Sequence, residues 1–349
     1  MKKVYLIPVL LFCGCIMNSC NNSSPVTAEA KPSKDSLVQD TIRRRVEILD
    51  AEGNKFLDSN SKVEVLAGGF KWTEGALYVA DGDYFLFSDI PNNKVYKWKD
   101  GGDTSLYLTP SGFTGILLTG TTGGSNGLIL DKKGQLVLMQ EGDRRIARMK
   151  APLSAPKPDF EKLADNYGGK HLNSPNDGIY NANGDLYFTD PPYGLKKGTQ
   201  DSAKELSFQG VMLLRPNGKV EVVTEELKYP NGIALTPDGK TLLIGNSDGD
   251  NKVWMKYDLN EKGLMKSSTV FYKPTIEEAK AHGSPDGMKI SKEGYLFATG
   301  PGGVWIFNPA GKPIARIYVG DLAANCALGK DEKILFMNCH QQVMRIRLK

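Results

Sequence analysis

A short apolar segment recurs six times along this chain, each time about 8 to 10 residues after an acidic or amide residue. Successive copies are separated by roughly 40 to 55 residues, which is enough for four antiparallel strands per repeat. Gly, Asp and Asn turns separate the alternating runs, and only residues 276–281 read as helix. The polar positions are Glu74, Asn126, Asn176, Asn231, Asp286 and Asn325, and the apolar segments are residues 84–89, 134–137, 184–190, 240–243, 294–297 and 332–336. We therefore predict an all-β fold, a six-bladed β-propeller.

The six polar positions share one place in the repeat, so in a propeller they converge on the central channel. Asn-Gly and Asp-Gly are also ordinary turn dipeptides, but a set of them in register with the blade period favours a functional site. Carboxylate and amide oxygens are ligands for hard cations. We predict that Glu74, Asn176, Asn231 and Asp286 bind one divalent metal ion. Ca²⁺ is favoured, with Zn²⁺, Mn²⁺ or Mg²⁺ as alternatives.

The amino terminus has the pattern of an export signal. A basic start precedes an apolar stretch, residues 4–17, that is too short to span a membrane. It ends at a lipobox-like sequence with Cys20 as the predicted lipidated residue; Cys13 and Cys15 fit less well, and simple cleavage near Ser19 is the alternative. The chain then divides into a signal peptide, residues 1–19, a lipidated and disordered tether, residues 20–45, and the propeller, residues 46–349. We expect an exported protein, attached to a membrane only through its lipid, on the periplasmic side or at the outer membrane of a bacterium.

Composition excludes several other classes of protein. The formal charge is +4, and no large basic cluster is present, so nucleic acid is not an expected partner. Three histidines are too few for a His-rich metal site, and no Gly-x-Ser-x-Gly sequence marks a serine hydrolase. Beyond Cys20 only Cys326 and Cys339 remain, and either a disulfide on neighbouring strands or two buried thiols fits their positions. We expect a monomer.

Several motifs in order along the chain resemble one known family. They occupy residues 74–78, 87–91, 125–128, 173–177, 187–194, 230–232, 285–289 and 297–304. The chain resembles the gluconolactonase/regucalcin-like family, also called the senescence marker protein family, and most closely its bacterial gluconolactonase-like branch. The likeness runs from about Phe70 to the carboxyl terminus.

The resemblance implies a channel metal, usually Ca²⁺, held by Glu74, Asn231 and Asp286, with Asn176 ligating the metal or orienting the substrate. It also implies hydrolysis of sugar lactones, such as glucono-δ-lactone, to the aldonic acid. A bound cation polarises a lactone carbonyl, and Asp286 is the candidate catalytic base for the attacking water. Metal ligation would lower the basicity of Asp286, so a base held off the metal is an alternative.

Five further residues are predicted to bind substrate. Asn126 and Asn325 complete the channel wall, and Tyr193, in a Pro-Pro-Tyr-Gly loop, is placed to pack on a sugar face. Two positions depart from the family pattern: Glu141 stands where relatives have histidine, and His171 where they often have arginine. An acid at position 141 predicts a rim less favourable to phosphorylated substrates.

Two other functions fit the same residues. One is a phosphotriesterase-like or other ester hydrolase acting at the same site. The other is a non-catalytic propeller that binds a ligand and uses the metal only for stability. Channel-facing metal positions disfavour this second reading, because a purely structural ion does not need them.

Overall fold

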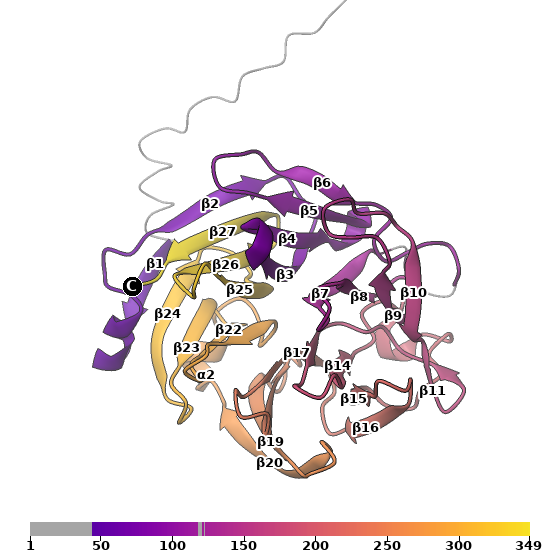
Figure 1. The fold of residues 1–349 in the computed structure, drawn as a ribbon. Helices are drawn as coiled ribbons and strands as arrows, with labels where there is room; N and C mark the ends of the chain where they lie inside the picture. Colours follow the sequence, from indigo (N-terminus) through magenta and orange to yellow (C-terminus); the bar gives the residue numbers. More distant parts are fainter. Residues whose placement is uncertain (1–43, 118–120, 122) are drawn as a thin grey trace, which may run out of the picture.

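The chain forms a ring of six antiparallel sheets around a central channel (Figure 1). The computed structural model describes residues 44–117, 121 and 123–349. Four consecutive strands make each of blades one to four. Blade one contains β3 (Thr73–Val79), β4 (Tyr84–Asp89), β5 (Lys94–Trp98) and β6 (Ser105–Leu108), and blade two contains β7 (Ser125–Leu130), β8 (Leu136–Gln140), β9 (Arg145–Met149) and β10 (Phe160–Ala164). Blade three contains β13 (Gly178–Tyr180), β14 (Leu186–Asp190), β15 (Gly210–Leu214) and β16 (Val220–Thr224), and blade four contains β17 (Pro230–Leu235), β18 (Thr241–Asn246), β19 (Val253–Leu259) and β20 (Met265–Tyr272). The predicted six-bladed β-propeller is confirmed.

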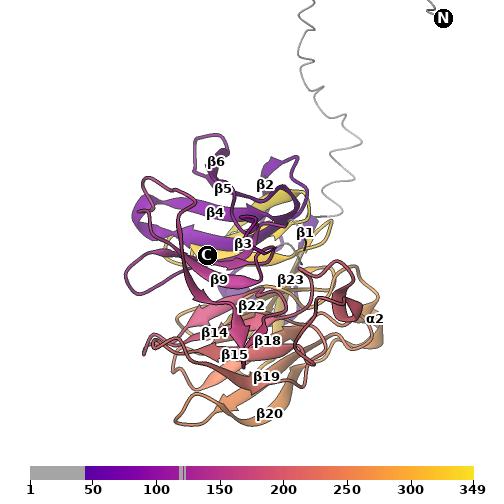
Figure 2. The same cartoon turned by 90° about the vertical axis from the view of Figure 1, so that its right-hand side faces the viewer.

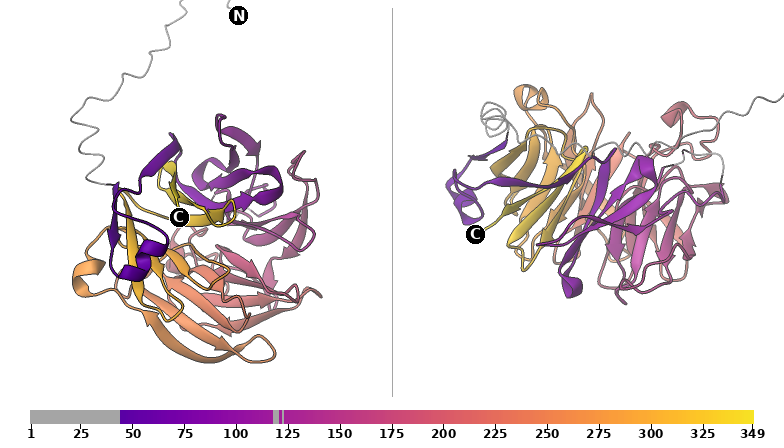
Figure 3. Two further views of the ribbon diagram at one scale, coloured as in Figure 1. Left: turned by 60° about the vertical axis from the view of Figure 1, so that its left-hand side comes forward. Right: turned by 90° about the horizontal axis from the view of Figure 1, so that it is seen from above.

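The last two blades combine strands from both ends of the described chain. Blade five contains β21 (Met288–Ile290), β22 (Leu296–Gly300), β23 (Gly303–Phe307), β24 (Pro313–Val319) and, at its outer edge, β1 (Arg44–Ile48). Blade six contains β25 (Asn325–Gly329), β26 (Ile334–Cys339), β27 (Gln342–Arg347) and, outermost, β2 (Val63–Gly68). Figure 3 shows these indigo amino-terminal strands beside the yellow carboxyl-terminal ones. The amino-terminal strand β2 therefore closes the ring as the fourth strand of blade six, and β1 adds a fifth strand to blade five.

The amino-terminal segments are described only in part. The predicted start of the propeller, residue 46, falls inside β1, which begins at Arg44. The predicted signal peptide, Cys20 and nearly all of the predicted tether lie outside the described residues. In the part of the chain that the structure describes, no helix has the length and apolar character needed to cross a bilayer.

Short helical and two-stranded segments complete the fold. The helix predicted for residues 276–281 is present as α2 (Ile276–Ala279), which begins with a capping box between Thr275 and Glu278. It projects from one face of the ring (Figures 2 and 3). The remaining elements are β11 (Asn166–Tyr167), β12 (Lys170–His171), and the 3₁₀ helices η1 (Ala51–Lys55), η2 (Ala80–Gly82), η3 (Ile90–Asn92) and η4 (Gly198–Gln200).

The hydrophobic core lies between adjacent blades. The apolar segments found in the sequence are the second strands of the blades, β4, β8, β14, β18, β22 and β26, and nearly all their apolar side chains are buried. At the closing junction, Phe85 of blade one stacks on Phe336 of blade six, with ring centroids 4.8 Å apart. Each second strand thus packs against its neighbours on both sides, and this packing fixes the inner strand beside it.

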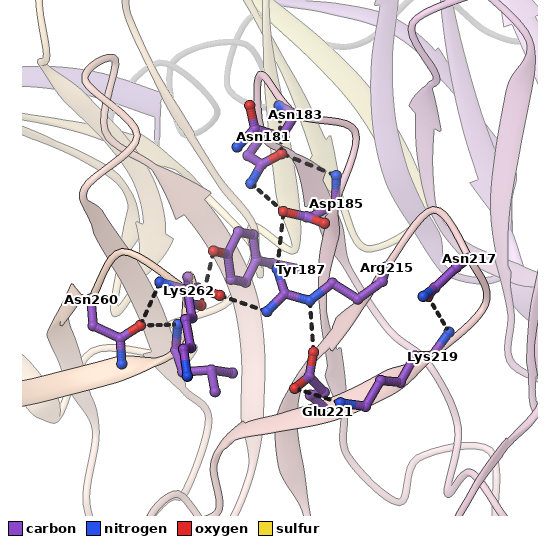
Figure 4. Close-up of polar contacts among 12 residues, drawn as sticks. Asn181, Asn183, Asp185, Tyr187, Arg215, Asn217, Lys219, Glu221, Asn260 and Lys262 are labelled. Carbon is purple, nitrogen blue, oxygen red and sulfur yellow. Dashed lines mark hydrogen bonds and ion pairs between the residues drawn. The ribbon is translucent and has the colours of Figure 1, made fainter.

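A polar network joins blades three and four (Figure 4). It lies at the end of the blades opposite to the one where β13 begins. Arg215 bonds to Glu221 at 2.7 Å and to Asp185 at 3.2 Å, and it donates to the backbone carbonyl of Lys262 at 2.5 Å. Tyr187 donates to the carbonyl of Gly263 at 2.9 Å. These contacts tie the turns of the two blades together.

The two cysteines in the described part of the chain, Cys326 and Cys339, are buried free thiols. Cys326 lies on β25 and Cys339 ends β26, so they do occupy neighbouring strands, as the sequence suggested. The register, however, pairs Cys326 with Met337, and Cys339 pairs with Gln342. Burial raises the pKa of Cys326 to about 12, so its thiol is unreactive. Of the two possibilities that the sequence left open, the structure has the buried thiols.

Candidate functional site

A pocket of ≈ 670 Å³ opens at one end of the channel, where the inner strands begin. Its volume suits a small-molecule ligand. Seven of the nine residues predicted for the site line it: Glu74, Asn126, Glu141, Asn176, Tyr193, Asn231 and Asp286. Glu74 lies at the start of blade one, and the other six residues come from blades two to five. The structure thus brings together residues that are up to about two hundred positions apart in sequence.

The loops that enter the inner strands are held by the residues that end the second strands. The Asp89 carboxylate accepts the backbone N–H groups of Lys71 and Trp72 just before Glu74. Asp190 accepts two N–H groups, both at 2.7 Å, from the loop before Asn176. The same device recurs in blade four, where Asn246 accepts the Tyr229 N–H ahead of Asn231. The loops are therefore fixed before any ligand arrives.

Hydrogen bonds between neighbouring blades then fix the site residues around the ring. A side chain or backbone group of one blade bonds to the backbone at or next to a site position of the next. The bonds are Ser88 Oγ to the Asn126 carbonyl, Gly127 N–H to the Asn176 carbonyl, Thr189 Oγ1 to the Asn231 carbonyl, Ser247 Oγ to the Pro285 carbonyl, Thr299 Oγ1 to the Ala324 carbonyl, and Asn338 Nδ2 to the Glu74 carbonyl. All six junctions are bridged in this way.

Burial keeps the carboxylates at the base of the pocket poorly solvated. Desolvation raises the pKa of Glu74 to about 7, and the charges of Asp177 and Glu141 act in the same direction. Burial also raises the pKa of Asp286 well above its usual range, reinforced by Glu74 and Asp177. Several acids in one desolvated pocket repel one another, and a bound cation would relieve that repulsion.

The oxygen atoms of the pocket residues show whether the site fits a hard cation. Oδ1 of Asp286 and Oδ1 of Asn126 are buried with no hydrogen-bond partner among the described residues. The Asn231 amide donates from Nδ2 to Ser247 Oγ at 2.9 Å, which leaves its carbonyl oxygen as the group available to a ligand. Within the described ranges, no three His, Cys, Asp or Glu side chains form a metal-binding group. Two carboxylates and two amides are nevertheless an all-oxygen donor set suited to Ca²⁺, so the residues fit.

Glu141 is the buried acid at the position where the family resemblance predicts histidine. Its Oε2 accepts a hydrogen bond from Asn126 Nδ2 at 3.4 Å. Desolvation raises its pKa to about 7, and the bond from Asn126 acts in the opposite direction. The side chain is thus partly neutral at physiological pH, which reduces the negative charge that the sequence suggested for the rim.

The structure places two predicted residues away from the pocket wall. Asn325, on β25, is buried and donates from Nδ2 to Glu74 Oε2 at 3.2 Å, and its amide also stabilises the ionised form of Asp177. Asn325 therefore contacts Glu74 and Asp177 without lining the pocket. His171 lies in the β11–β12 hairpin, where its backbone N–H bonds to the Glu205 carboxylate at 2.8 Å. It does not line the pocket.

Other functional candidates were missed in the sequence. Ser247 follows the end of β18 and bonds on both sides, and no motif marks it. His282 lines the pocket with Lys252 and Trp72, and no sequence motif indicates this. The Asn-Asp-Gly sequence contains Asp177, but nothing local indicates that this acid is buried and that its charge acts on Glu74 and Asp286. Turns rather than the repeat bring Ser247 and His282 to the pocket, whereas Asp177 follows the repeated position Asn176 and lies outside the pocket lining.

Comparisons with known proteins agree with this architecture. A gluconolactonase of Zymomonas mobilis is 35% identical over 338 residues, covering 94% of this chain and 92% of its own. A lactonohydrolase of Aspergillus oryzae is 25% identical over half of this chain and 43% of its own length.

Among solved structures, a gluconolactonase of Xanthomonas campestris has 25% identity and a TM-score of 0.74, covering 88% of this chain and 95% of its own. The calcium-binding protein regucalcin of Agrobacterium tumefaciens shares the fold at 17% identity, with a TM-score of 0.64 over 83% of this chain and 95% of its own. The model of the SMP-30/Gluconolactonase/LRE-like region matches residues 72–341. With that match over most of its length, the chain belongs to the SMP-30/gluconolactonase/LRE-like family.

Proposed function

We propose that this protein is a lactonase that opens sugar lactones such as glucono-δ-lactone to the aldonic acid. The observation that carries the proposal is the pocket itself, where Glu74, Asn176, Asn231 and Asp286 converge from four blades. The gluconolactonase similar to this chain over more than nine-tenths of its length supports the same substrate class. The pocket volume is large enough for a six-membered sugar lactone.

We infer that these four residues hold one divalent cation, with Ca²⁺ favoured. The all-oxygen donor set, the unpaired Oδ1 of Asp286 and the likeness to a calcium-binding propeller support this inference. When bound, the cation would polarise the lactone carbonyl and offset the negative charge that develops on its oxygen.

The side chains of the pocket have separable tasks. Asp286 is proposed as the general base that takes a proton from water; burial raises its pKa, and ligation of a cation would act in the opposite direction. Tyr193 is 38% exposed and stacks on Tyr229 at 6.0 Å, and so offers an aromatic edge for a sugar ring. Asn126 has an unpaired Oδ1 in the pocket wall that can accept a bond from a substrate hydroxyl.

The test measures hydrolysis of glucono-δ-lactone by the purified protein with added Ca²⁺ or with EDTA. We expect Asp286→Asn to lower kcat at least about 100-fold, since general-base catalysis contributes on that order. Asp250→Asn, on an exposed turn of blade four, is the control and should leave the rate unchanged. Wild-type turnover in the Asp286 variant would contradict the assigned base, and no turnover by the wild type would contradict the lactonase function.

We also propose that the protein is exported and lipidated at Cys20. The basic start, the short apolar stretch and the lipobox-like sequence support this. Radiolabelled palmitate should be incorporated into the wild type and not into Cys20→Ser. Equal labelling of both, or of neither, would contradict the proposal.

A further inference from the structure

We propose that Glu141 is a second catalytic residue, the general acid that protonates the ring oxygen as the lactone opens. This inference rests on the lactonase function proposed above and extends it. Hydrolysis of a lactone needs a base for the attacking water and an acid for the departing alkoxide. The first task was given to Asp286, and the second requires a proton donor elsewhere in the pocket.

Glu141 occupies the side of the pocket opposite Asp286. It follows β8, the second strand of blade two, whereas Asp286 precedes β21, the inner strand of blade five. In a ring of six blades, the second and the fifth face each other across the channel, as β8 and β22 do in Figure 1. Both residues line the same pocket. A lactone between them would present its carbonyl to one carboxyl group and its ring oxygen toward the other.

The Glu141 side chain is held in place by close packing. It is only 6% exposed. Gly194, in the Pro-Pro-Tyr-Gly loop, lies so near that a Cβ at this glycine would be 2.7 Å from Glu141 Cγ. Asn126 Nδ2 donates a hydrogen bond to Glu141 Oε2. The carboxyl group is therefore confined to the pocket wall, as positioning of a proton donor requires.

Among the described residues, no cation contributes to the pKa shift of Glu141, which has burial and the bond from Asn126 as its causes. The neighbouring Arg145 pairs with Asp143 at 3.1 Å, and Arg144 donates to the backbone carbonyls of Leu172, Asn173 and Ala203. Glu74 is the acid whose pKa responds to the charge of Glu141. Burial raises the pKa of Glu141 to about 7, so a large fraction of molecules carries the proton at neutral pH.

The proposed step balances in protons and electron pairs. Water adds its oxygen to the carbonyl carbon and gives one proton to Asp286. In the resulting tetrahedral adduct, the bond between the former carbonyl carbon and the ring oxygen breaks, its electron pair stays on the ring oxygen, and that oxygen takes the proton of Glu141. The product is the open hydroxy acid, and exchange with solvent returns the proton from Asp286 and restores that of Glu141.

The test compares two lactones that differ in their need for an acid. The alkoxide of glucono-δ-lactone is a strong base, whereas a lactone of a phenol releases a phenoxide whose conjugate acid has a pKa of about 10 and needs little assistance. For Glu141→Gln, which keeps the side-chain volume and the acceptor for Asn126, we expect kcat on glucono-δ-lactone to fall by about 10²–10⁴-fold. With the phenolic lactone dihydrocoumarin, kcat should fall less than about fivefold.

The matched control is Glu161→Gln, an exposed acid on the same blade, which should affect neither substrate. Equal losses on both lactones would overturn the proposal and assign Glu141 to binding or structure, and no loss would overturn it as well. Should Glu141→Gln not fold, Glu141→Asp must show the same selective loss, of at least about tenfold, or the proposal fails. A wild type that opens neither lactone would instead refute the proposed function, and this inference with it.

Discussion

Replacing Ser247 by alanine removes one hydroxyl that links two proposed cation ligands. Ser247 Oγ accepts the Nδ2 hydrogen of Asn231 at 2.9 Å and donates to the carbonyl of Pro285 at 2.5 Å. The first bond sets which end of the Asn231 amide faces the pocket. The second holds the peptide that leads into Asp286. We therefore expect Ser247→Ala to weaken cation binding without removing a ligand.

The size of the effect follows from these two bonds. Each contributes about 1 kcal/mol to folding, and the carbonyl left unpaired adds a further cost, so unfolding should become about 2–3 kcal/mol easier. That corresponds to a Tm lower by about 3–5 °C. Loss of the fixed amide orientation should cost about 1.4 kcal/mol of cation binding, which is roughly a tenfold rise in Kd.

Calorimetric titration with Ca²⁺ measures the Kd, and thermal unfolding in EDTA measures the stability. Ser247→Thr keeps the hydroxyl and should bind Ca²⁺ as the wild type does. Ser291→Ala is the matched control, because Ser291 Oγ accepts the Tyr295 N–H at 3.0 Å in a turn outside the pocket. It should lower the Tm and leave the Kd unchanged. An unchanged Kd in Ser247→Ala would refute the reasoning.

Two further predictions concern the base of the pocket. The pKa of Glu74 is raised from 4.5 to about 7 in the folded state, so between these pH values the folded protein binds more protons than the unfolded chain. The resulting contribution of about 3 kcal/mol to the free energy of unfolding is fully present below pH 4.5 and is lost as pH rises through 7. In EDTA the Tm should therefore fall between pH 5 and pH 8, and the increase in Tm on adding Ca²⁺ should grow over that range. Glu74→Gln should lessen the pH dependence of the Tm. A Tm that does not change with pH would contradict this prediction. Gly232→Ala would place a Cβ 2.0 Å from the Asp286 carbonyl oxygen. We expect about 2–3 kcal/mol of lost stability and strongly reduced turnover, measured beside Gly102→Ala, whose nearest contact is at 3.6 Å; equal behaviour of the two variants would show that the channel strands can shift apart.

The repeat made the fold predictable because a propeller uses each position six times. Residues such as Asn231 stand at one place in every blade, and closure of the ring requires that equivalent positions surround one axis. The second strands were equally visible, since both of their faces are buried between blades and their apolar residues are continuous. Local sequence and global architecture agree at these positions.

The parts that could not be predicted depend on partners far away in sequence. β1 and β2 look like isolated strands until they pair with β24 and β27, more than 250 residues later. His171 stands two residues before Asn173 in sequence, yet the β11–β12 hairpin holds it away from the pocket. Ser247 reaches the site because a turn follows β18, and single-sequence patterns do not specify the direction of a side chain in a turn.

The site becomes asymmetric where the blades depart from their common pattern. Six identical blades would give a symmetric ring of amides, which has no charge to hold a cation and no distinction between acid and base. Carboxylates replace amides at Glu74 and Asp286, and Glu141 adds a third acid from outside the repeated position. A bond from Asn325 holds Glu74, and close packing against Gly194 confines Glu141, so these two acids have little freedom to move apart. A bound cation beside Glu74 and Asp286, together with a proton on Glu141, would satisfy all three acids, and this is the arrangement that the proposed lactone opening would use.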